Sequence, residues 1–420
     1  MTTEQTPSFP VAWAREQFPA LRRRIGNRPI IYLDGPGGTQ VSEKVIHAIA
    51  DYYRNSNSNL GGKFATSVET ATLVLRARIA LAEFINAGQP QEIVFGQNMT
   101  SLTFALSRSL ARTWSHDSEI IVTSLDHDAN ITPWRLAAAE RRVTVRIWEV
   151  RKETCLLDLE DLRPLLTERT ALIAVTLASN ACGSHVDVRA VADLAKKVQA
   201  KVFVDAVHYA PHGRIDVQAL GCDFLACSAY KFFGPHIGVL WGREEWLSQT
   251  ESFKVRPAAN CPPGKWETGT QSLESIAGTL AALDYLRCLA KTANNTTSIV
   301  DAMDLIRNYE FTLSQRFLSR IATIPRVNIY GIANPLEAMW RTPTFAIRVE
   351  GISPDHVAHK LSDIGIFVWS GDFYAVDLIE RLGLKEKGGV VRIGFVHYNT
   401  SEEVDRVLEA LEEMSGQTAG

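Results

Sequence analysis

The chain has 420 residues, of which 46% are hydrophobic and 22% are charged, and 44 basic against 47 acidic side chains give a net charge of −3. This near-neutral balance gives no electrostatic reason to expect a nucleic acid or an anionic membrane as a partner. The length exceeds that of a usual single domain and favours one large and one small domain.

The sequence shows no targeting or membrane-spanning pattern. The N-terminus, MTTEQTPSFPVAW, has no basic region followed by an apolar core, and no apolar run approaches the ~18–20 residues of a membrane span. The six cysteines are scattered without a CxxC pair, which favours reduced thiols over a disulfide framework or a zinc site. We therefore expect a soluble cytoplasmic protein.

The first 85 residues alternate short ordered segments with polar loops. An amphipathic helix is predicted over 11–24, and a short strand over 30–34 runs into Gly35-Pro-Gly-Gly38, a loop that is free to adopt unusual backbone angles. A helix over 41–53 leads to a loop over 55–62 rich in asparagine, serine and glycine, which alone would be a plain surface connection. Thr66-Ser-Val-Glu69 fits a capping box, and helical spacing continues from there to Ala82.

Strands and helices then alternate regularly. The predicted strands are 92–95, 119–123, 144–148, 171–176, 201–205, 223–228 and 237–241, and the predicted helices are 100–111, 133–141 and 186–199. Nearly all-apolar strands in such an alternation indicate a mostly parallel sheet covered on both faces. Ligands of these sheets bind at the carboxyl ends of the strands.

The C-terminal part predicts a smaller α+β unit. A helix over 275–290 is expected before it; the helices 299–321, 354–364 and 401–415 and the strands 326–330, 344–350, 365–369 and 390–395 are expected within residues 296–420.

The stretch from Asp205 to Gly238, which begins at the end of the apolar run 201–205, carries the clearest chemistry. Asp205 ends one apolar strand, and Lys231 lies between a second apolar strand and a Gly-Pro turn. Such a lysine is expected to be partly desolvated, which lowers its pKa and makes its amine a nucleophile toward carbonyls. Together the two residues suggest a pyridoxal phosphate site, with Lys231 forming a Schiff base and Asp205 holding the pyridine nitrogen protonated.

A zinc site made by His208, His212 and Asp205 is the alternative for this stretch, because the spacing suits a metal. Pro211 disfavours a continuous helix that would present both histidines, so we rank this alternative well below the first.

The motifs SNSNLGG, DAVHYAPH and SAYKFFGPHIG, in this order, resemble aminotransferase class V, and within it the cysteine desulfurase and selenocysteine lyase group. The resemblance runs from about Tyr32 to Arg406. It implies a fold-type I pyridoxal phosphate enzyme with a large, mostly parallel α/β domain over 31–295. The small α+β domain would comprise residues 1–30 and 296–420.

The resemblance also implies roles for residues around the cofactor ring. Lys231 matches the Schiff-base lysine, and Asp205 matches the aspartate paired with the pyridine nitrogen. His127 matches a histidine that stacks on the ring and shuttles protons. His208 stands where desulfurases carry a glutamine near the ring hydroxyl, and Asn180 matches a residue beside that hydroxyl.

The phosphate and the substrate have their own matches. Backbone N–H groups at a helix N-terminus bind phosphate, and the predicted phosphate-binding residues are Met99, Thr100, Ser228 and Tyr230. Thr270 matches a threonine that a neighbouring subunit contributes, which implies a homodimer with shared active sites. Arg392 matches the arginine that binds the substrate's α-carboxylate.

The chain departs from true desulfurases in one loop. There a mobile loop carries the cysteine that takes the substrate sulfur, whereas the corresponding Trp369–Ala375 has none and no cysteine follows Cys288. Tyr374 lies near the expected position, either as an acid or as a wall of the pocket. Cys182 and Cys261 are near the expected site in sequence but are not on the loop, so persulfide transfer is doubtful.

We therefore expect a pyridoxal phosphate-dependent enzyme acting on an amino acid. The first choice is β-carbon–sulfur cleavage of cysteine or an S-substituted cysteine, by way of a quinonoid and an aminoacrylate. The alternatives are an aminotransferase or epimerase of a specialised metabolite, an oxidative outcome, and a non-catalytic interaction module that keeps the fold.

Overall fold

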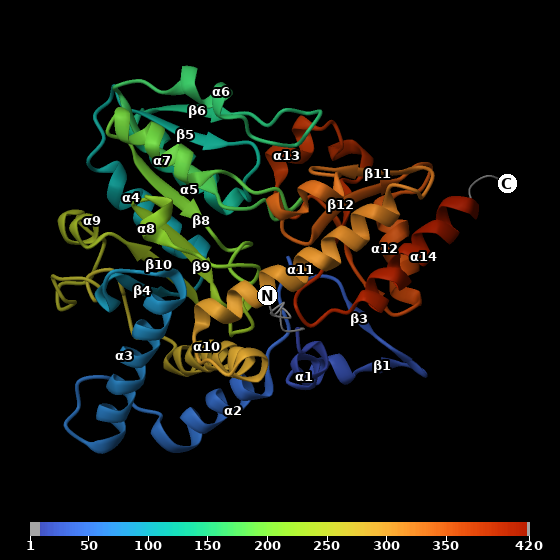
Figure 1. The fold of residues 1–420 in the computed structure, drawn as a ribbon. Helices are drawn as coiled ribbons and strands as arrows, with labels where there is room; N and C mark the ends of the chain where they lie inside the picture. The colour runs from blue at the N-terminus through green and yellow to red at the C-terminus, as the bar shows by residue number, and fades with distance from the viewer. Residues whose placement is uncertain (1–8, 418–420) are drawn as a thin grey trace, which may run out of the picture.

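The computed structural model describes residues 9–417 and has a seven-stranded sheet at its centre (Figure 1). Its strands are β4 (Ile93–Gly96), β5 (Glu119–Thr123), β6 (Thr144–Trp148), β7 (Thr170–Thr176), β8 (Lys201–Asp205), β9 (Phe224–Ser228) and β10 (Gly238–Gly242). They lie in the order β4-β10-β9-β8-β7-β5-β6. Only β10 is antiparallel to its neighbours β9 and β4. The predicted mostly parallel sheet is confirmed.

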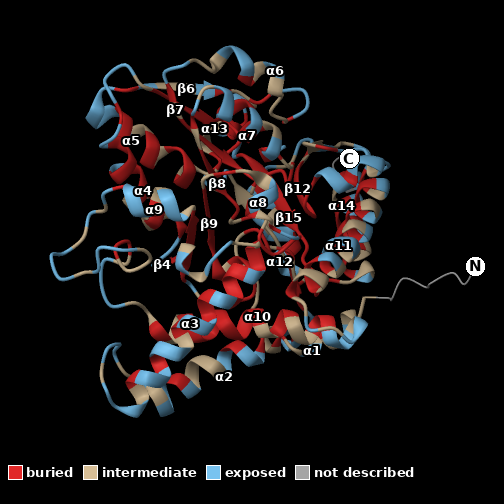
Figure 2. Cartoon of the chain, turned by 60° about the vertical axis from the view of Figure 1, so that its left-hand side comes forward, coloured by how far each residue is buried: buried red, intermediate tan, exposed pale blue. Residues whose placement is uncertain are grey.

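Hydrophobic clusters fill both faces of this sheet. Along β8, Val202 and Val204 belong to one cluster while Phe203, between them, belongs to the other, as the alternation of side chains in a strand requires. The first cluster includes residues of the helices α3 (Ala65–Ile85), α7 (Val188–Lys197) and α10 (Leu273–Asn294). The second includes residues of α4 (Met99–Ala111), α5 (Thr132–Arg141) and α9 (Glu244–Gln249). Figure 2 shows the buried residues concentrated in the strands and on the inner sides of these helices.

A second sheet of four antiparallel strands comes from the C-terminal part, on the right of Figure 1. Its strands are β11 (Val327–Tyr330), β12 (Thr344–Val349), β14 (Trp369–Gly371) and β15 (Val390–Gly394), in the order β11-β12-β15-β14. The helices α11 (Ile299–Ile321), α12 (Pro354–Asp363) and α14 (Ser401–Gln417) share its hydrophobic core. The short β3 (Ile31–Tyr32) pairs with β13 (Ile366–Phe367), and Ile31 and Leu33 are buried in the same core.

The remaining elements are short connections. The helices are α1 (Val11–Glu16), α2 (Glu43–Asp51), α6 (Leu159–Leu162), α8 (Val217–Leu220) and α13 (Val376–Arg381), and the strands are β1 (Arg24–Ile25) and β2 (Arg28–Pro29). No helix within residues 9–417 is long and apolar enough to cross a lipid bilayer. The predicted domain division at residues 31 and 295 stays a prediction. Residues 1–8 and 418–420, the ends of the predicted small domain, lie outside the described range.

The predicted capping box at Thr66–Glu69 is wrong. The helix α3 begins at Ala65, and its N-cap Phe64 makes no side-chain cap bond. The polar side chains of the first turns instead fasten the preceding loop. Ser67 Oγ donates to Asn59 O at 2.6 Å, and Ser56 Oγ donates to Glu69 Oε2 at 3.0 Å.

Two other predicted elements are divided. The helix over 11–24 ends at Glu16, and a separate 3-10 helix begins at Pro19, because a residue before proline is kept out of the helical region and Phe18 is extended. The strand over 365–369 divides around Val368. Its first part pairs with β3 and its second part with β15, which belong to different sheets.

Candidate active site

A cavity of about 710 Å³ opens at the carboxyl ends of β7, β8 and β9. Residues of the second sheet and of the loop before β15 close its other side. All predicted site residues except Thr270 line it, namely Met99, Thr100, His127, Asn180, Asp205, His208, Ser228, Tyr230, Lys231, Tyr374 and Arg392. Topology thus brings together side chains that are spread over most of the chain.

Lys231 lies just after β9 and is 8% exposed. Its ammonium group donates a hydrogen bond to Pro36 O. Burial lowers the pKa of Lys231 to about 7, with the nearby Arg392 charge acting in the same direction. A substantial fraction of this amine is therefore neutral near pH 7 and able to add to a carbonyl.

Two carboxyl groups, Asp205 and Asp126, are buried in this region. Asp205 Oδ1 accepts the Val207 N–H at 2.8 Å, and burial raises the pKa of Asp205 to about 6 against the opposing effects of that bond and of Lys231. Asp126 accepts hydrogen bonds from Thr123 and, at 2.6 Å, from Asn130, and burial raises its pKa to about 7. Sequence reasoning missed Asp126, although its place immediately before His127 at a strand end was a usable signal.

His127 has a defined hydrogen-bonding state. Its Nδ1 accepts the Ala129 N–H at 3.0 Å, which places the proton of the neutral ring on Nε2. Burial lowers the pKa of His127 to about 4, and Lys231 adds to this effect. The Tyr374 ring stacks on the imidazole with centroids 5.3 Å apart.

The N-terminus of α4 faces the cavity. The Met99 N–H donates to Ser228 Oγ at 3.0 Å, and Asn98 caps the Ser101 N–H at 2.9 Å. Among the described residues, the Thr100 N–H has no protein acceptor. An open N–H at a helix N-terminus suits a phosphate. Tyr230, also predicted here, stacks on His236 with centroids 4.9 Å apart.

Arg392 extends from β15 into the cavity and is 3% exposed. Its Nη2 lies 2.9 Å from Asp34 Oδ1, its Nη1 donates to Asn180 O at 3.2 Å, and its guanidinium lies over the Phe373 ring at 4.2 Å. No sequence motif indicates the contact between Asp34 and Arg392.

In the glycine loop after Asp34, the lack of side chains allows other atoms to come close to the backbone, and it is not used to adopt unusual backbone angles. None of its glycines has a positive φ, contrary to the expectation from sequence. A Cβ on Gly37 would lie 2.1 Å from Asp34 Oδ2, whereas one on Gly38 would make an ordinary contact of 3.4 Å with Tyr230. Gly37 is therefore needed for the carboxylate of Asp34 to reach its place.

Three buried polar atoms of the cavity lining have no hydrogen-bond partner: Asn180 Oδ1, His208 Nδ1 and Arg392 Nε. Burying a polar atom without a hydrogen-bond partner costs free energy, so these atoms indicate that a ligand binds here. Together with a reactive amine, a buried carboxyl group and an open helix N-terminus, they fit pyridoxal phosphate, which carries a carbonyl, a ring hydroxyl, a ring nitrogen and a phosphate. The residues therefore fit the cofactor expected from the sequence.

The loop before α13 forms the outer wall. Phe373 and Tyr374 both have positive φ, 56° and 59°, which is uncommon for residues other than glycine. Two bonds hold this conformation: the Asp128 N–H donates to Tyr374 O at 2.7 Å and Asn180 Nδ2 donates to Phe373 O at 2.9 Å. Tyr374 itself is 69% exposed.

The cysteines lie elsewhere. Of the residues that the structure describes, no cysteine lines the cavity; Cys182 is buried in its own loop and Cys261 is exposed. Thr270 is exposed and does not line the cavity of its own chain.

The zinc alternative finds no support in the geometry. His208 Nε2 bonds to Thr342 Oγ1 at 3.0 Å, while His212 Nδ1 bonds to Glu310 at 2.8 Å. Residues 9–417 contain no group of three potential ligands placed to hold a metal ion.

Comparisons with known proteins agree with this geometry. The family model described as aminotransferase class-V matches residues 31–407. The aminotransferase-like protein FGM3 of Gibberella zeae is 35% identical over 96% of this chain and 98% of its own length. A cysteine desulfurase of Serratia proteamaculans is 31% identical over 96% of this chain and 98% of its own. The apo cysteine desulfurase of Thermococcus onnurineus NA1 superposes with a TM-score of 0.87 at 26% identity, covering 99% of this chain and all of that one.

Proposed function

The chain belongs to the aminotransferase class-V family of pyridoxal phosphate-dependent enzymes, and on this premise we propose that it cleaves the β-carbon–sulfur bond of cysteine or an S-substituted cysteine. The observation that carries the proposal is the composition of the cavity. Lys231 and Arg392 line it, but within the described chain no cysteine does. An elimination can release a thiolate without an acceptor on the enzyme, whereas persulfide formation needs a cysteine at the reacting sulfur.

The cofactor would be held at several points. Lys231 would bond covalently to its carbonyl, Asp205 would face the ring nitrogen, and the Thr100 N–H with Ser228 would face the phosphate. His208 Nδ1 and Asn180 Oδ1 would meet the ring hydroxyl. When bound, pyridoxal phosphate supplies an electron-withdrawing ring that stabilises negative charge at the substrate's α-carbon.

The protein's own residues would orient the substrate and move its protons. Arg392 would bind the α-carboxylate through its planar fork, already fixed by Asp34 at 2.9 Å. Lys231 Nζ, once free, would remove the α-proton, a task that suits an amine with a pKa of about 7. Phe373 and Tyr374 would shield the reacting atoms from water. The Cβ–S bond would break with the electron pair leaving on sulfur as a thiolate, and one water would hydrolyse the released three-carbon enamine to pyruvate and ammonia.

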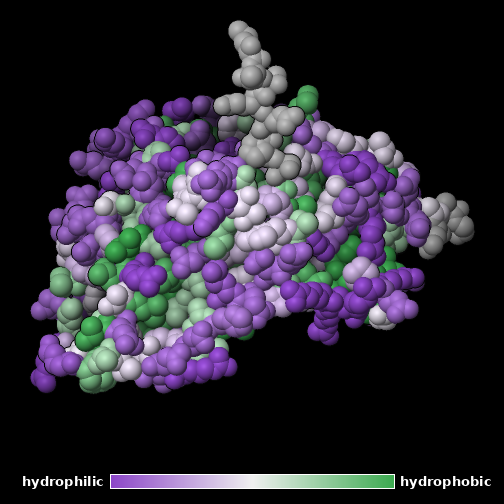
Figure 3. Space-filling model, turned by 60° about the horizontal axis from the view of Figure 1, so that its bottom comes forward, coloured by the Kyte–Doolittle hydropathy of each residue, from purple (hydrophilic) through white to green (hydrophobic). Residues whose placement is uncertain are grey.

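We also propose a cytoplasmic homodimer with shared active sites. The matching Thr270 is exposed and away from its own cavity, as a residue donated to a second subunit would be. Large apolar side chains are exposed on and near α2 and α3, namely Ile46, Tyr53, Leu60, Phe64, Val68, Leu75 and Ile79. Figure 3 views this underside and shows apolar side chains gathered on its left part. A contiguous exposed apolar surface is typical of an interface.

The product assay tests the reaction. The cofactor-loaded enzyme is incubated with L-cysteine, L-cystine and S-methyl-L-cysteine, and pyruvate, ammonia and alanine are measured. Pyruvate with equimolar ammonia is the expected result. Alanine with sulfur bound to the enzyme would contradict it, because one of the cysteines would then accept sulfur.

Amino-group transfer or epimerisation is the second candidate, because the relative FGM3 is named aminotransferase-like. If none of the sulfur substrates yields pyruvate or alanine, this candidate takes precedence. Exchange of the α-hydrogen with deuterated solvent, with and without a 2-oxo acid acceptor, would then distinguish the two reactions.

A further inference from the structure

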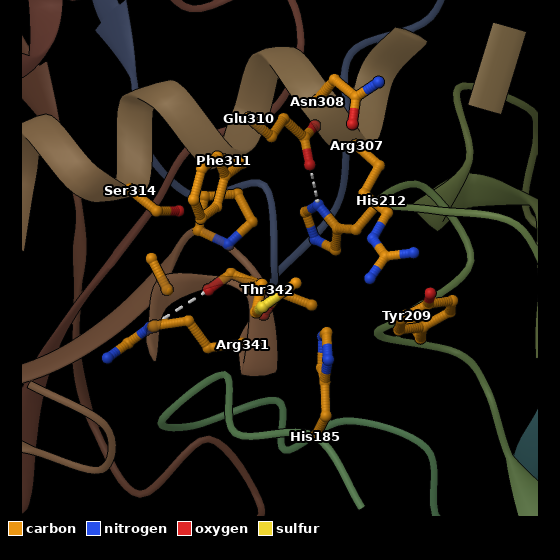
Figure 4. Close-up of a pocket in the computed structure, with 13 residues that line it drawn as sticks. His185, Tyr209, His212, Arg307, Asn308, Glu310, Phe311, Ser314, Arg341 and Thr342 are labelled. Atoms are coloured by element: carbon orange, nitrogen blue, oxygen red, sulfur yellow. Dashed lines mark hydrogen bonds and ion pairs between the residues drawn. The ribbon is translucent and has the colours of Figure 1, made fainter. Parts of the chain in front are cut away.

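A second cavity, of about 320 Å³, lies beside the catalytic one and shares no lining residue with it. In Figure 4, α11 crosses above it and contributes Arg307 and Glu310, while His185 approaches from the loop after β7. Tyr209 and His212 come from the loop after β8. Its volume falls at the lower end of the range for small-molecule sites.

The lining contains two guanidinium groups, those of Arg307 and Arg341, and neither forms an ion pair with a carboxylate among residues 9–417. Arg341 is 4% exposed, and its N–H groups bond only to backbone carbonyl oxygens, including Cys182 O at 3.0 Å and Thr342 O at 3.3 Å. Arg307 is exposed at the mouth. A buried cation without a counter-charge is unfavourable, so an anion in this cavity would be stabilised.

The one carboxyl group of the lining, Glu310, is engaged with His212. Glu310 Oε2 lies 2.8 Å from His212 Nδ1, and both side chains are almost fully buried. Burial raises the pKa of Glu310, while His212 opposes the shift. Whichever of the two holds the proton, the two arginines leave the lining with a net positive charge.

Unpartnered polar atoms are also present in this lining. His185 Nε2, His212 Nε2 and Glu310 Oε1 are buried and have no hydrogen-bond partner. Burial lowers the pKa of His185 to about 3, with Arg307 contributing, so the ring is neutral and Nε2 can serve as a hydrogen-bond site. Such atoms are exceptions in folded proteins and indicate a ligand.

Part of the lining is apolar, namely Phe311, Ala338, Met339 and Pro343. A lining that combines positive charge with apolar side chains suits an anion that has a hydrocarbon part. A hydrated inorganic anion would leave the apolar wall unused.

We propose that this second cavity binds a small organic carboxylate. The carboxylate group lies between Arg307 and the Nε2 atoms of His185 and His212, and the hydrocarbon part lies against Phe311 and Met339. Thr342 lines this cavity and His208 lines the catalytic one. A hydrogen bond of 3.0 Å between Thr342 Oγ1 and His208 Nε2 therefore links the two linings.

The test is ligand-observed NMR on the cofactor-loaded protein, with butyrate as the probe and the neutral isostere butyramide as its control. Butyrate is expected to bind and butyramide is not. Arg307→Gln should weaken butyrate binding by about tenfold, the loss of a charge-assisted contact. Arg320→Gln, on the same helix but outside the cavity, should leave binding unchanged.

A second variant distinguishes the two cavities. Arg392→Lys alters the proposed carboxylate site of the catalytic cavity, so butyrate in the second cavity should stay bound while any butyrate held by Arg392 is lost. Loss of binding in Arg392→Lys with none in Arg307→Gln would place the anion in the catalytic cavity and overturn the proposal. Binding of inorganic phosphate but not butyrate, or no binding of butyrate at millimolar concentration, would overturn it as well.

Discussion

Arg392 Nη2 lies 2.9 Å from Asp34 Oδ1, although the two residues are 358 positions apart in the chain. The arginine proposed to bind the substrate is therefore fixed by a carboxylate before any substrate arrives. Arg392 Nη2 is held by Asp34 and Nη1 by Asn180 O, whereas Nε has no partner and is available to a ligand. Preorganisation of this kind lowers the entropy cost of binding.

The Asp34–Arg392 pair should depend on Gly37. In Gly37→Ala the new Cβ would lie 2.1 Å from Asp34 Oδ2, so the carboxylate must move and Arg392 loses its support. We expect KM for the amino acid to rise by about tenfold, with a smaller change in kcat. Steady-state kinetics measure this. Gly38→Ala, whose Cβ meets only ordinary contacts, is the matched control, and equal KM values in both variants would contradict the prediction.

Lys231→Ala should abolish covalent attachment of the cofactor. The variant loses the only amine that the described residues present to the cavity, and we expect turnover to fall by at least ~10³-fold. Borohydride reduction followed by peptide mass spectrometry identifies the attachment site. Lys265→Ala removes another buried lysine, which bonds to Ser248 O at 2.8 Å outside the cavity, and it should keep attachment. Adduct formation on a lysine other than Lys231 would disprove the assignment.

Cofactor attachment should be faster at higher pH. Only the neutral amine of Lys231 is nucleophilic, and burial lowers its pKa to about 7 from an ordinary value of 10.5. The rate for cofactor-free protein should therefore rise about tenfold per unit below pH 7 and level off above it. Stopped-flow absorbance between pH 5 and 8.5 measures the profile. A rate that still rises about tenfold per unit between pH 7 and 8.5 would mean that the lysine is not desolvated.

Much of the catalytic cavity could be predicted from the sequence, because Lys231 and Asp205 stand in strand-end motifs whose placement follows from a parallel sheet, whereas Arg392, in the middle of the antiparallel strand β15, was expected only from the family resemblance. The parts that were missed depend on contacts across the fold. Asp34 becomes significant only when β15 lies beside its loop, and the second cavity forms only where α11 meets the loops after β7 and β8. The local sequence pattern also predicted a capping box at Thr66 wrongly, because Ser67 and Glu69 form hydrogen bonds with the preceding loop instead of capping the helix.

Tyr374 should act through its ring. Tyr374→Phe preserves the stack on His127, so kcat/KM should stay within about twofold, while Tyr374→Ala should reduce it by up to about tenfold, the range for an aromatic pair. Steady-state kinetics of both variants distinguish the contribution of the Tyr374 ring from that of its hydroxyl group. A ~100-fold loss in Tyr374→Phe would instead assign proton transfer to the phenol.

No cysteine should be needed for turnover. Burial raises the pKa of Cys155, Cys222 and Cys227 to about 12, so these thiols should resist alkylation, whereas Cys261 is exposed. Iodoacetamide should label Cys261 in the native enzyme without loss of pyruvate formation. Mass spectrometry locates the label, and the double variant with Cys182→Ala and Cys261→Ala is the genetic counterpart. Loss of C–S cleavage in that variant would contradict the prediction, because a cysteine would then be needed to accept the sulfur as a persulfide.

The position of β15 has a consequence for how the enzyme matures. This strand lies between β12 and β14 in the second sheet and carries Arg392, yet it follows every strand of the seven-stranded sheet in the chain. A nascent chain on the ribosome can complete the seven-stranded sheet, with Asp205 and Lys231 in place, well before residues 390–394 emerge. It cannot close the cavity or fix Asp34 until then. Chains that end before residue 390 can therefore hold the reactive lysine while they lack Arg392, the residue proposed to bind the substrate.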